Sequence, residues 1–434
     1  MNDGPFGFNP PGGDDAERPA GEPAGAGGFD MAAIGAMLQQ LGQFLQSGTG
    51  NVSGSVNWDL ASQVARNALT SLGDPAPTAA EQEEVLNAVD LADVWLDAAT
   101  QFPAGGGRAE AWSRSAWFEA TLPAWKQIVN PVAEQMAQAM QQLLPGGGDQ
   151  PPGTGLPAGL PLELPAEMAA MGGPLVGMLR AMSSAAIGMQ VGQGLVALAG
   201  EVLGAGDIGV PLLSDSRVGL VPANVEAFGS GLGLPADEVM LFVALREAAH
   251  QRLFAHVPWL RSRVLSSIEV YAAGIHIDRQ RIEEAMGGMD PTDPASLQSA
   301  LAEGVFEVED SEQQRAALAR LETILALVEG WVDDTVGVAA SDRLPSYTRV
   351  SEVLRRRRAT GGPAEKTFAT LVGLELRPRR LRDAAALWSR LRADGGLAAR
   401  DGLWGHPDLL PASEDLDDVE EFIERSRQDD SGSE

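Results

Sequence analysis

The stretch that decides the fold spans residues 236–256 and reads Ala236-Asp-Glu-Val-Met-Leu-Phe-Val-Ala-Leu-Arg246-Glu247-Ala-Ala-His250-Gln-Arg-Leu-Phe-Ala-His256. A proline followed by two acidic residues is typical of a helix start, and Pro258 disfavours helical geometry at the residue before it. The sequence therefore predicts one long helix that ends near His256. Residues four apart share a helix face, so Arg246 and His250 are expected on the same side with Glu247 beside them.

Glu247 and His250 have the spacing of a metallopeptidase motif. In the motif His-Glu-x-x-His, two histidines bind zinc and the glutamate acts as general base on the metal-bound water. Here Arg246 stands in the first ligand position, and a guanidinium is always protonated and has no lone pair to donate. The pattern Glu-x-x-His is a weak signal by itself, because a chain with 60 acidic residues and 4 histidines can contain it by chance.

Beyond His250, the sequence contains three candidates for a further zinc ligand: Glu329, Glu269 and His256. Glu329-Gly-Trp-Val-Asp333 places two carboxylates four residues apart after an apolar run, and this resembles the downstream glutamate helix of gluzincins. Glu269, nineteen residues after His250, has only its spacing in favour. His256 could join His250 only if the helix ended between them, so a helix C-terminal role is favoured for it.

These segments, together with Trp58-Asp-Leu, Val221-Pro-Ala-Asn and His256-Val-Pro-Trp-Leu, resemble an actinobacterial family of zincin-like, zinc-dependent metallopeptidases. The resemblance covers most of the chain outside its tails. It implies Zn²⁺ as the cofactor, Glu247 as the general base, and His250 and Glu329 as zinc ligands. It cannot supply a ligand at position 246.

Two hypotheses about function follow from Arg246. In the first, the protein is a zinc peptidase with a degenerate motif, in which Glu247 deprotonates a zinc-bound water that attacks a peptide bond. In the second, the Arg246 guanidinium takes the metal position and pairs with Glu329 or Asp333. The protein would then be a metal-free pseudoenzyme that serves as a structural or peptide- or protein-binding module.

The fold class is predicted to be mainly α, with a zincin-like helical core and a small β element at residues 218–221 or 305–308. Tryptophans at 112, 117 and 125 are expected in the core rather than in a ligand groove. The predicted organisation is a disordered Gly/Pro-rich tail (1–28), a helical amino-terminal region (29–144), a Gly/Pro-rich linker or loop (145–165), the zincin-like core (166–412) and an acidic disordered tail (413–434).

Composition limits the partners. A hydrophobic content of 44% over 434 residues can bury a large core, and the absence of cysteine excludes disulfides and Cys-ligated zinc. The net charge of −29 argues against nucleic acid and anionic membranes as partners. The uncharged run 181–200 is expected to be a buried helix rather than a membrane span, because it contains glutamines and glycines. We therefore expect a cytoplasmic protein with a peptide or protein partner, and the sequence leaves the oligomeric state open.

Overall fold

The structure is a computed structural model that describes residues 54–143, 166–274, 311–359 and 380–431. All of them belong to one compact unit, Ser53–Glu434. The predicted tail (1–28), the predicted linker (145–165) and the strand fragment 305–308 lie outside the described residues.

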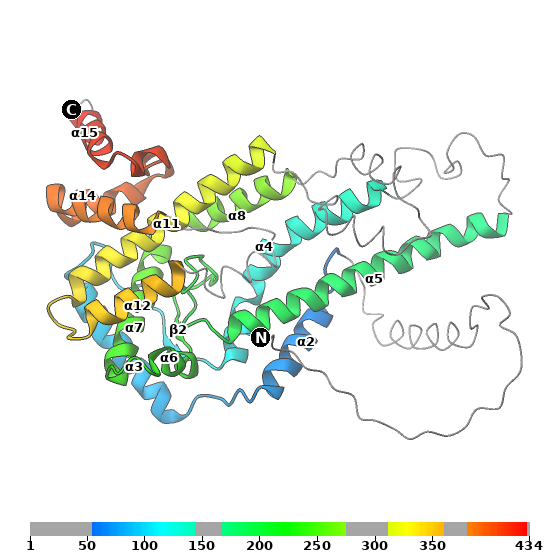
Figure 1. The fold of residues 1–434 in the computed structure, drawn as a ribbon, viewed down its shortest axis with the longest axis horizontal. Helices are drawn as coiled ribbons and strands as arrows, with labels where there is room; N and C mark the ends of the chain where they lie inside the picture. Colours follow the sequence, from blue (N-terminus) through cyan, green and yellow to red (C-terminus); the bar gives the residue numbers. More distant parts are fainter. Residues whose placement is uncertain (1–53, 144–165, 275–310, 360–379, 432–434) are drawn as a thin grey trace, which may run out of the picture. The chain divides into compact units, whose positions relative to one another are not determined.

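The fold is mainly α, as predicted, with one small sheet (Figure 1). Strands β1 (Ala109–Ala111) and β2 (Val218–Leu220) pair in parallel, so the predicted β element near 218 does form a strand. The helices are α2 (Trp58–Ser71), α3 (Ala79–Leu96), α4 (Arg114–Leu143), α5 (Ala166–Ala199), α6 (Pro222–Gly229), α7 (Ala236–His256), α8 (Pro258–Ala273), α11 (Glu312–Ala340), α12 (Tyr347–Ala359), α14 (Leu381–Gly402) and α15 (Val419–Ser431).

Helix α7 lies at the centre of the fold. Every residue from Val239 to Leu253 is buried, so the helix has no solvated face and packs against α3, α6, α8, α11 and β2. It starts after Pro235 with Asp237 and Glu238 in its first turn, where acidic side chains favour the helix dipole. It ends at His256 because Val257 leaves helical geometry before Pro258 begins α8.

Local capping fixes the two helices that flank α7. Thr78 and Glu81 form a capping box at the start of α3, and Ser311 and Gln314 form another at the start of α11. Helix α11 then places the segment from Leu321 to Val332 almost entirely in the core, next to α7 and α14. Helices α7 and α11 carry most of the residues of the candidate site.

One hydrophobic core joins the amino-terminal helices to the later ones. Trp112, Trp117 and Trp125 are buried in it, which confirms their predicted core role. Buried Arg252 of α7 donates hydrogen bonds to the Asp93 side chain and backbone carbonyl and to the Phe102 carbonyl. The regions 29–144 and 166–412 therefore do not form separate cores over the described residues.

The prediction of a disordered tail at 413–434 differs from the structure. Residues 419–431 form α15, and Leu416, Phe422 and Ile423 are buried. Counting charges across the segment hid this short apolar pattern. Several acidic side chains are also paired: Asp417 with Arg380, Glu420 with Arg390 and Asp415 with Arg425.

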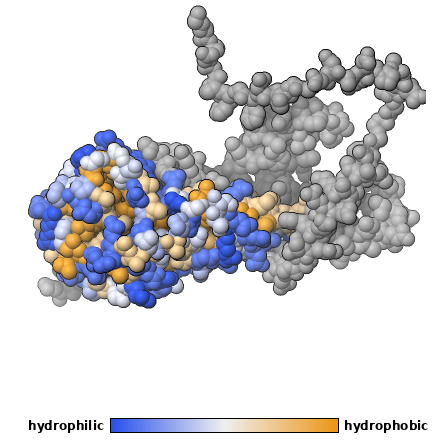
Figure 2. Space-filling model, turned by 90° about the horizontal axis from the view of Figure 1, so that it is seen from below, coloured by the Kyte–Doolittle hydropathy of each residue, from blue (hydrophilic) through white to orange (hydrophobic). Residues whose placement is uncertain are grey.

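One described helix, Arg180–Ala199, is long and apolar enough to cross a membrane by length and composition alone. The core helix of a soluble protein passes the same test. Here Val191, Leu195 and Leu198 are buried in the core, and this stretch of α5 packs on α2. Hydrophilic and hydrophobic residues alternate over the face seen in Figure 2.

Candidate functional site

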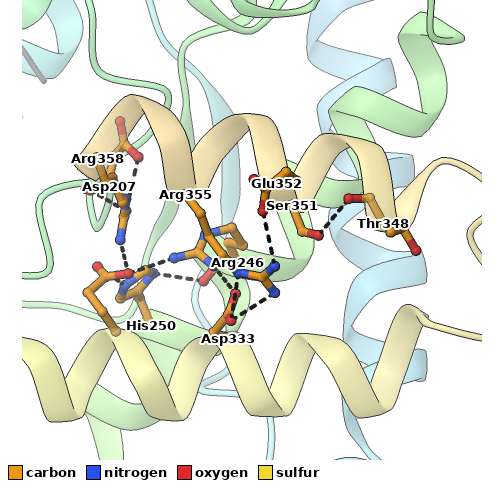
Figure 3. A network of polar contacts seen from close by, with 10 residues as sticks. Asp207, Arg246, His250, Asp333, Thr348, Ser351, Glu352, Arg355 and Arg358 are labelled. Atoms are coloured by element: carbon orange, nitrogen blue, oxygen red, sulfur yellow. Dashed lines mark hydrogen bonds and ion pairs between the residues drawn. The ribbon is translucent and has the colours of Figure 1, made fainter. Parts of the chain in front are cut away.

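Helix α7 brings Arg246, Glu247 and His250 together in the interior. Their exposed fractions are 7%, 3% and 1%, so each polar group must find a partner within the protein. Helix α11 supplies Glu329 and Asp333, which lie four residues apart on one face. The structure thus places the two predicted motif segments side by side (Figure 3).

Arg246 contacts two carboxylates of α11, those of Glu329 and Asp333. Its Nη2 atom is 2.6 Å from Glu329 Oε2, and its Nη1 atom is 3.5 Å from Asp333 Oδ1. Burial lowers the pKa of Arg246, and the nearby Asp333 and Asp207 carboxylates oppose that effect. The guanidinium therefore remains charged and is balanced by carboxylates.

His250 is enclosed on both sides of its ring. Nδ1 lies 2.8 Å from the Arg246 carbonyl oxygen and Nε2 lies 3.0 Å from Glu329 Oε1. Burial, together with the Arg246 and Arg358 guanidinium groups, lowers the pKa of His250 to about 3. The ring is therefore neutral at neutral pH, and its single N–H can satisfy only one of the two oxygens.

Glu247 has both carboxylate oxygens occupied. Oε2 accepts a hydrogen bond of 2.8 Å from the Gly206 backbone N–H, and Oε1 accepts one of 2.9 Å from the Gln251 side chain. Burial raises the pKa of Glu247, an effect that neighbouring His250 and these hydrogen bonds oppose. A general base needs an oxygen within reach of the water it activates; each Glu247 oxygen accepts one hydrogen bond from the protein and keeps a second lone pair.

A second arginine comes from α12. Arg358 donates to Glu329 Oε2 and, over 2.6 Å, to the Asp207 backbone carbonyl. Burial raises the pKa of Asp207, but the Arg358 and Arg357 charges outweigh this effect and hold it below its usual value. Arg355 of the same helix pairs with Asp333 over 3.1 Å. Figure 3 shows Arg355 and Arg358 pointing from α12 towards Arg246 and His250.

The donor set does not fit the three-ligand zinc centre of a zincin. His250 Nε2 and Glu329 Oε1 do converge, and both are zinc-donor types. The third position, however, holds the Arg246 guanidinium, and Arg358 contacts the same Glu329 carboxylate. Among the residues that the structure describes, no group of three or more His, Asp or Glu side chains is placed to hold a metal ion.

The alternative ligands lie elsewhere. His256 Nδ1 is 2.8 Å from the Arg252 carbonyl oxygen, and its ring stacks on Phe102 at the end of α7. Glu269 lines an open cavity of about 640 Å³ between α4 and α8, together with Lys126 and Asn130. Neither residue contacts the cluster around Arg246.

Sequence reasoning did not find Asp207, Arg355 or Arg358 as site residues. A run of four arginines such as 355–358 is typical of a solvated helix face. Its partners Asp333, Glu329 and Asp207 are acidic, but they lie inside the fold. The glycines at 204, 206 and 209 around Asp207 were the available signal, because closely spaced glycines mark close approach of the backbone to another group.

Comparison with known proteins identifies a matching family model and a similar crystal structure. The family model described as "Zincin-like metallopeptidase" matches residues 56–423. A crystal structure from Chloroflexus aurantiacus, described as a "putative hydrolase with a novel fold", is similar with a TM-score of 0.58 at 20% identity, covering 86% of this chain and 99% of that one. At this identity the likeness shows the fold alone. A search of curated proteins finds no match.

Proposed function

The chain belongs to the zincin-like metallopeptidase family, and we propose that it is a metal-independent member that binds a peptide or protein segment instead of hydrolysing it. In this proposal an arginine replaces the catalytic metal. The position between α7 and α11 then holds a guanidinium that ties the two helices together.

The observation that carries the proposal is the contact between Arg246 and Glu329. Arg246 occupies the first ligand position of the motif, and its Nη2 atom lies 2.6 Å from the carboxylate that the family resemblance implies as a ligand. A charge-assisted hydrogen bond of this length is strong. Glu329 could bind a metal in the usual way only after losing Arg246 and Arg358.

The charge of the cluster supports the same conclusion. Arg246, Arg355 and Arg358 face the carboxylates of Asp207, Glu329 and Asp333, so the positive and negative groups balance without an ion. A divalent cation added beside the buried Arg246 and the partly buried Arg358 guanidinium groups would be repelled, because the interior screens charge poorly. Glu247 is not part of this balance, and its oxygens accept hydrogen bonds from Gly206 and Gln251 instead.

A zinc peptidase is the second candidate. Its support is the family match over most of the chain and the retained pair of Glu247 and His250. It would require Arg246 and Arg358 to leave Glu329 and a third ligand to enter. We place it second because each of those groups has a partner in the cluster.

The expected partner is a peptide or protein rather than nucleic acid, because the net charge of −29 repels phosphate backbones. We propose a cytoplasmic location on the same grounds of composition.

Metal analysis separates the two candidates. Purified wild-type protein, loaded with zinc and then dialysed, is expected to hold no stoichiometric zinc by mass spectrometry. The double variant Arg246→His with Arg358→Gln restores a third donor and frees Glu329, so we expect it to take up zinc. Arg246→Lys with Arg358→Gln is the matched control, because it keeps a cation at position 246. One zinc per wild-type chain that disappears on His250→Ala would overturn the proposal.

Hydrolysis is tested separately from metal binding. Wild type and Glu247→Gln are incubated with the same mixed peptide library, and cleavage is followed by mass spectrometry. We expect the two preparations to give identical traces. Cleavage by wild type that is absent in Glu247→Gln would show that the protein is a peptidase.

A further inference from the structure

The segment 203–209, which follows α5, lies directly over the candidate site. The Gly206 N–H donates to Glu247 Oε2, and the Leu203 N–H donates to Asp207 Oδ2 over 3.1 Å. Val202 to Gly206 are all buried. The segment therefore covers the face of α7 that carries Glu247 and His250.

Three glycines let this segment approach the site with its backbone. A Cβ atom added at Gly204 would lie 2.7 Å from Glu247 Oε2, and one at Gly206 would lie 2.8 Å from His250 Cβ. One at Gly209 would lie 2.9 Å from Glu329 Oε1, and Gly209 also has a φ of +74°. Each glycine thus packs against a different site residue, and no larger side chain fits between them.

The same segment pairs with β2 as an added strand would. Gly204 and Leu220 form an antiparallel bridge. The Ala205 N–H donates to the Gly219 carbonyl over 3.1 Å, and the Val221 N–H donates to the Leu203 carbonyl over 2.9 Å. If the segment withdrew, this edge would present unpaired backbone groups of the kind that bind a peptide by strand addition.

Arg358 fastens the segment from the opposite side. Its Nη2 atom donates to the Asp207 carbonyl over 2.6 Å and lies 3.4 Å from Asp207 Oδ1, while Nη1 donates to Glu329 (Figure 3). Arg358 therefore bridges α12, the segment and α11. Loss of this bridge would leave Asp207, a partly buried carboxylate, with less compensation.

We propose that residues 203–209 are an internal occupant of the site, bound in the manner of a peptide and latched by Arg358. The site is thus autoinhibited, and its ligand class is a peptide segment that replaces residues 203–209 along β2 and has small residues at the positions of Gly204, Gly206 and Gly209. The ligand class rests on the proposed function; the occupancy and the latch do not.

Cysteine labelling tests the latch, because the chain has no cysteine of its own. Ala205→Cys places a thiol in the segment at a side chain that is 1% exposed. Labelling with a maleimide under native conditions then reports how often the segment opens. A lost hydrogen bond to a charged group shifts an equilibrium by about tenfold or more, so Arg358→Gln should accelerate labelling by about that factor.

Two controls make the result specific. Arg349→Gln removes the same charge from the same helix, but Arg349 is exposed and donates to the Leu232 carbonyl, so labelling of Cys at 205 should not change. Ala124→Cys, buried in α4, reports opening elsewhere and should label equally with and without Arg358→Gln. If Arg358→Gln does not fold by circular dichroism, Arg358→Lys replaces it, since lysine lacks the planar fork that makes both contacts.

The proposal is overturned if Arg358→Gln leaves the labelling rate at 205 unchanged, or if Arg349→Gln raises it equally. An equal rise at both reporter positions would mean global loosening and would overturn it too. All labelling is done with a chelator present, so the result does not depend on zinc. A failed latch would therefore leave the metal analysis standing, and zinc uptake by wild type would leave the latch standing.

Discussion

The guanidinium of Arg246 requires a different arrangement of neighbouring groups than a metal ion does. A metal needs several lone pairs directed at one point, whereas a guanidinium needs acceptor oxygens around its plane. Glu329 and Asp333, one turn apart on α11, supply such oxygens. In our proposal, Arg246 and Arg358, which both contact Glu329, therefore give these helices an ion-pair cluster in place of a metal centre.

His250 provides a test of the cluster through pH. Its pKa falls from 6.5 to about 3 on folding, chiefly by burial, so the unfolded chain binds the extra proton over this interval. The contribution of His250 to stability is complete above pH 6.5 and is lost as pH falls towards 3, by up to about 1.4 kcal/mol per pH unit. We expect His250→Gln to remove this part of the slope in urea unfolding measured from about pH 7 to about pH 4.

The carboxylates titrate in wild type and in His250→Gln alike. The contribution of His250 is therefore the difference between the two curves of unfolding free energy against pH. Parallel curves would mean that the folded protein keeps the proton. In that case the proton would lie between His250 Nε2 and Glu329 Oε1, which are 3.0 Å apart.

At the scale of single elements, local sequence features predicted helices α7 and α11 but not how distant segments meet. Helix α7 was predicted from the proline and acidic residues at its start, and α11 from the apolar run before Glu329. Both signals are visible in the sequence because helix starts and periodicity are local properties. The pairing of Arg246 with Glu329 was one of two hypotheses. Asp207 and Arg358 could not be placed, because no local pattern states that a glycine-rich segment and the end of α12 meet over α7.

Helix α5 shows how an element can mislead. Gly188 and Gly192 lie four residues apart in its apolar part, a spacing typical of helix pairs in membranes. In this fold they face α2 instead: an added Cβ would lie 2.5 Å from the Asn57 carbonyl oxygen at Gly188 and 2.7 Å from that of Ala61 at Gly192. The two glycines therefore let α2 approach α5 closely.

Alanine substitution of Gly192 measures this close approach. Backbone atoms of α2 would have to move, so we expect Gly192→Ala to destabilise the protein by about 1–3 kcal/mol in urea unfolding. Gly177 lies in the same helix with nothing within 4 Å of an added Cβ, so Gly177→Ala should stabilise by about 0.5–1 kcal/mol. Equal effects of the two substitutions would show that α2 does not pack on α5 in this way.

Across the whole molecule, buried arginines connect regions that the sequence suggested were separate. Arg400 of α14 is fully buried, and its three donor groups reach Asp401, Asp334 and the Ala99 carbonyl over 2.7 to 2.9 Å. Asp401 in turn accepts hydrogen bonds from Thr100 and Trp331. The end of α14 is therefore joined to the loop after α3 through one network.

This network predicts cooperative unfolding. Arg400→Met leaves Asp334 and Asp401 buried with less compensation, so we expect a loss of about 3–5 kcal/mol in the free energy of unfolding. Arg390→Met, in the exposed part of α14, removes only surface pairs with Asp394 and Glu420 and should cost no more than about 1 kcal/mol.

Because tryptophans occur in both the amino-terminal and the later helices, fluorescence samples both regions. Urea curves from fluorescence and far-UV circular dichroism should coincide in wild type and shift together in Arg400→Met, as expected for a single core. Two separated transitions in wild type would show that residues 54–143 unfold independently of the rest. The contacts of Arg252 and Arg400 would then contribute too little to couple the two regions, although both side chains lie in the interior.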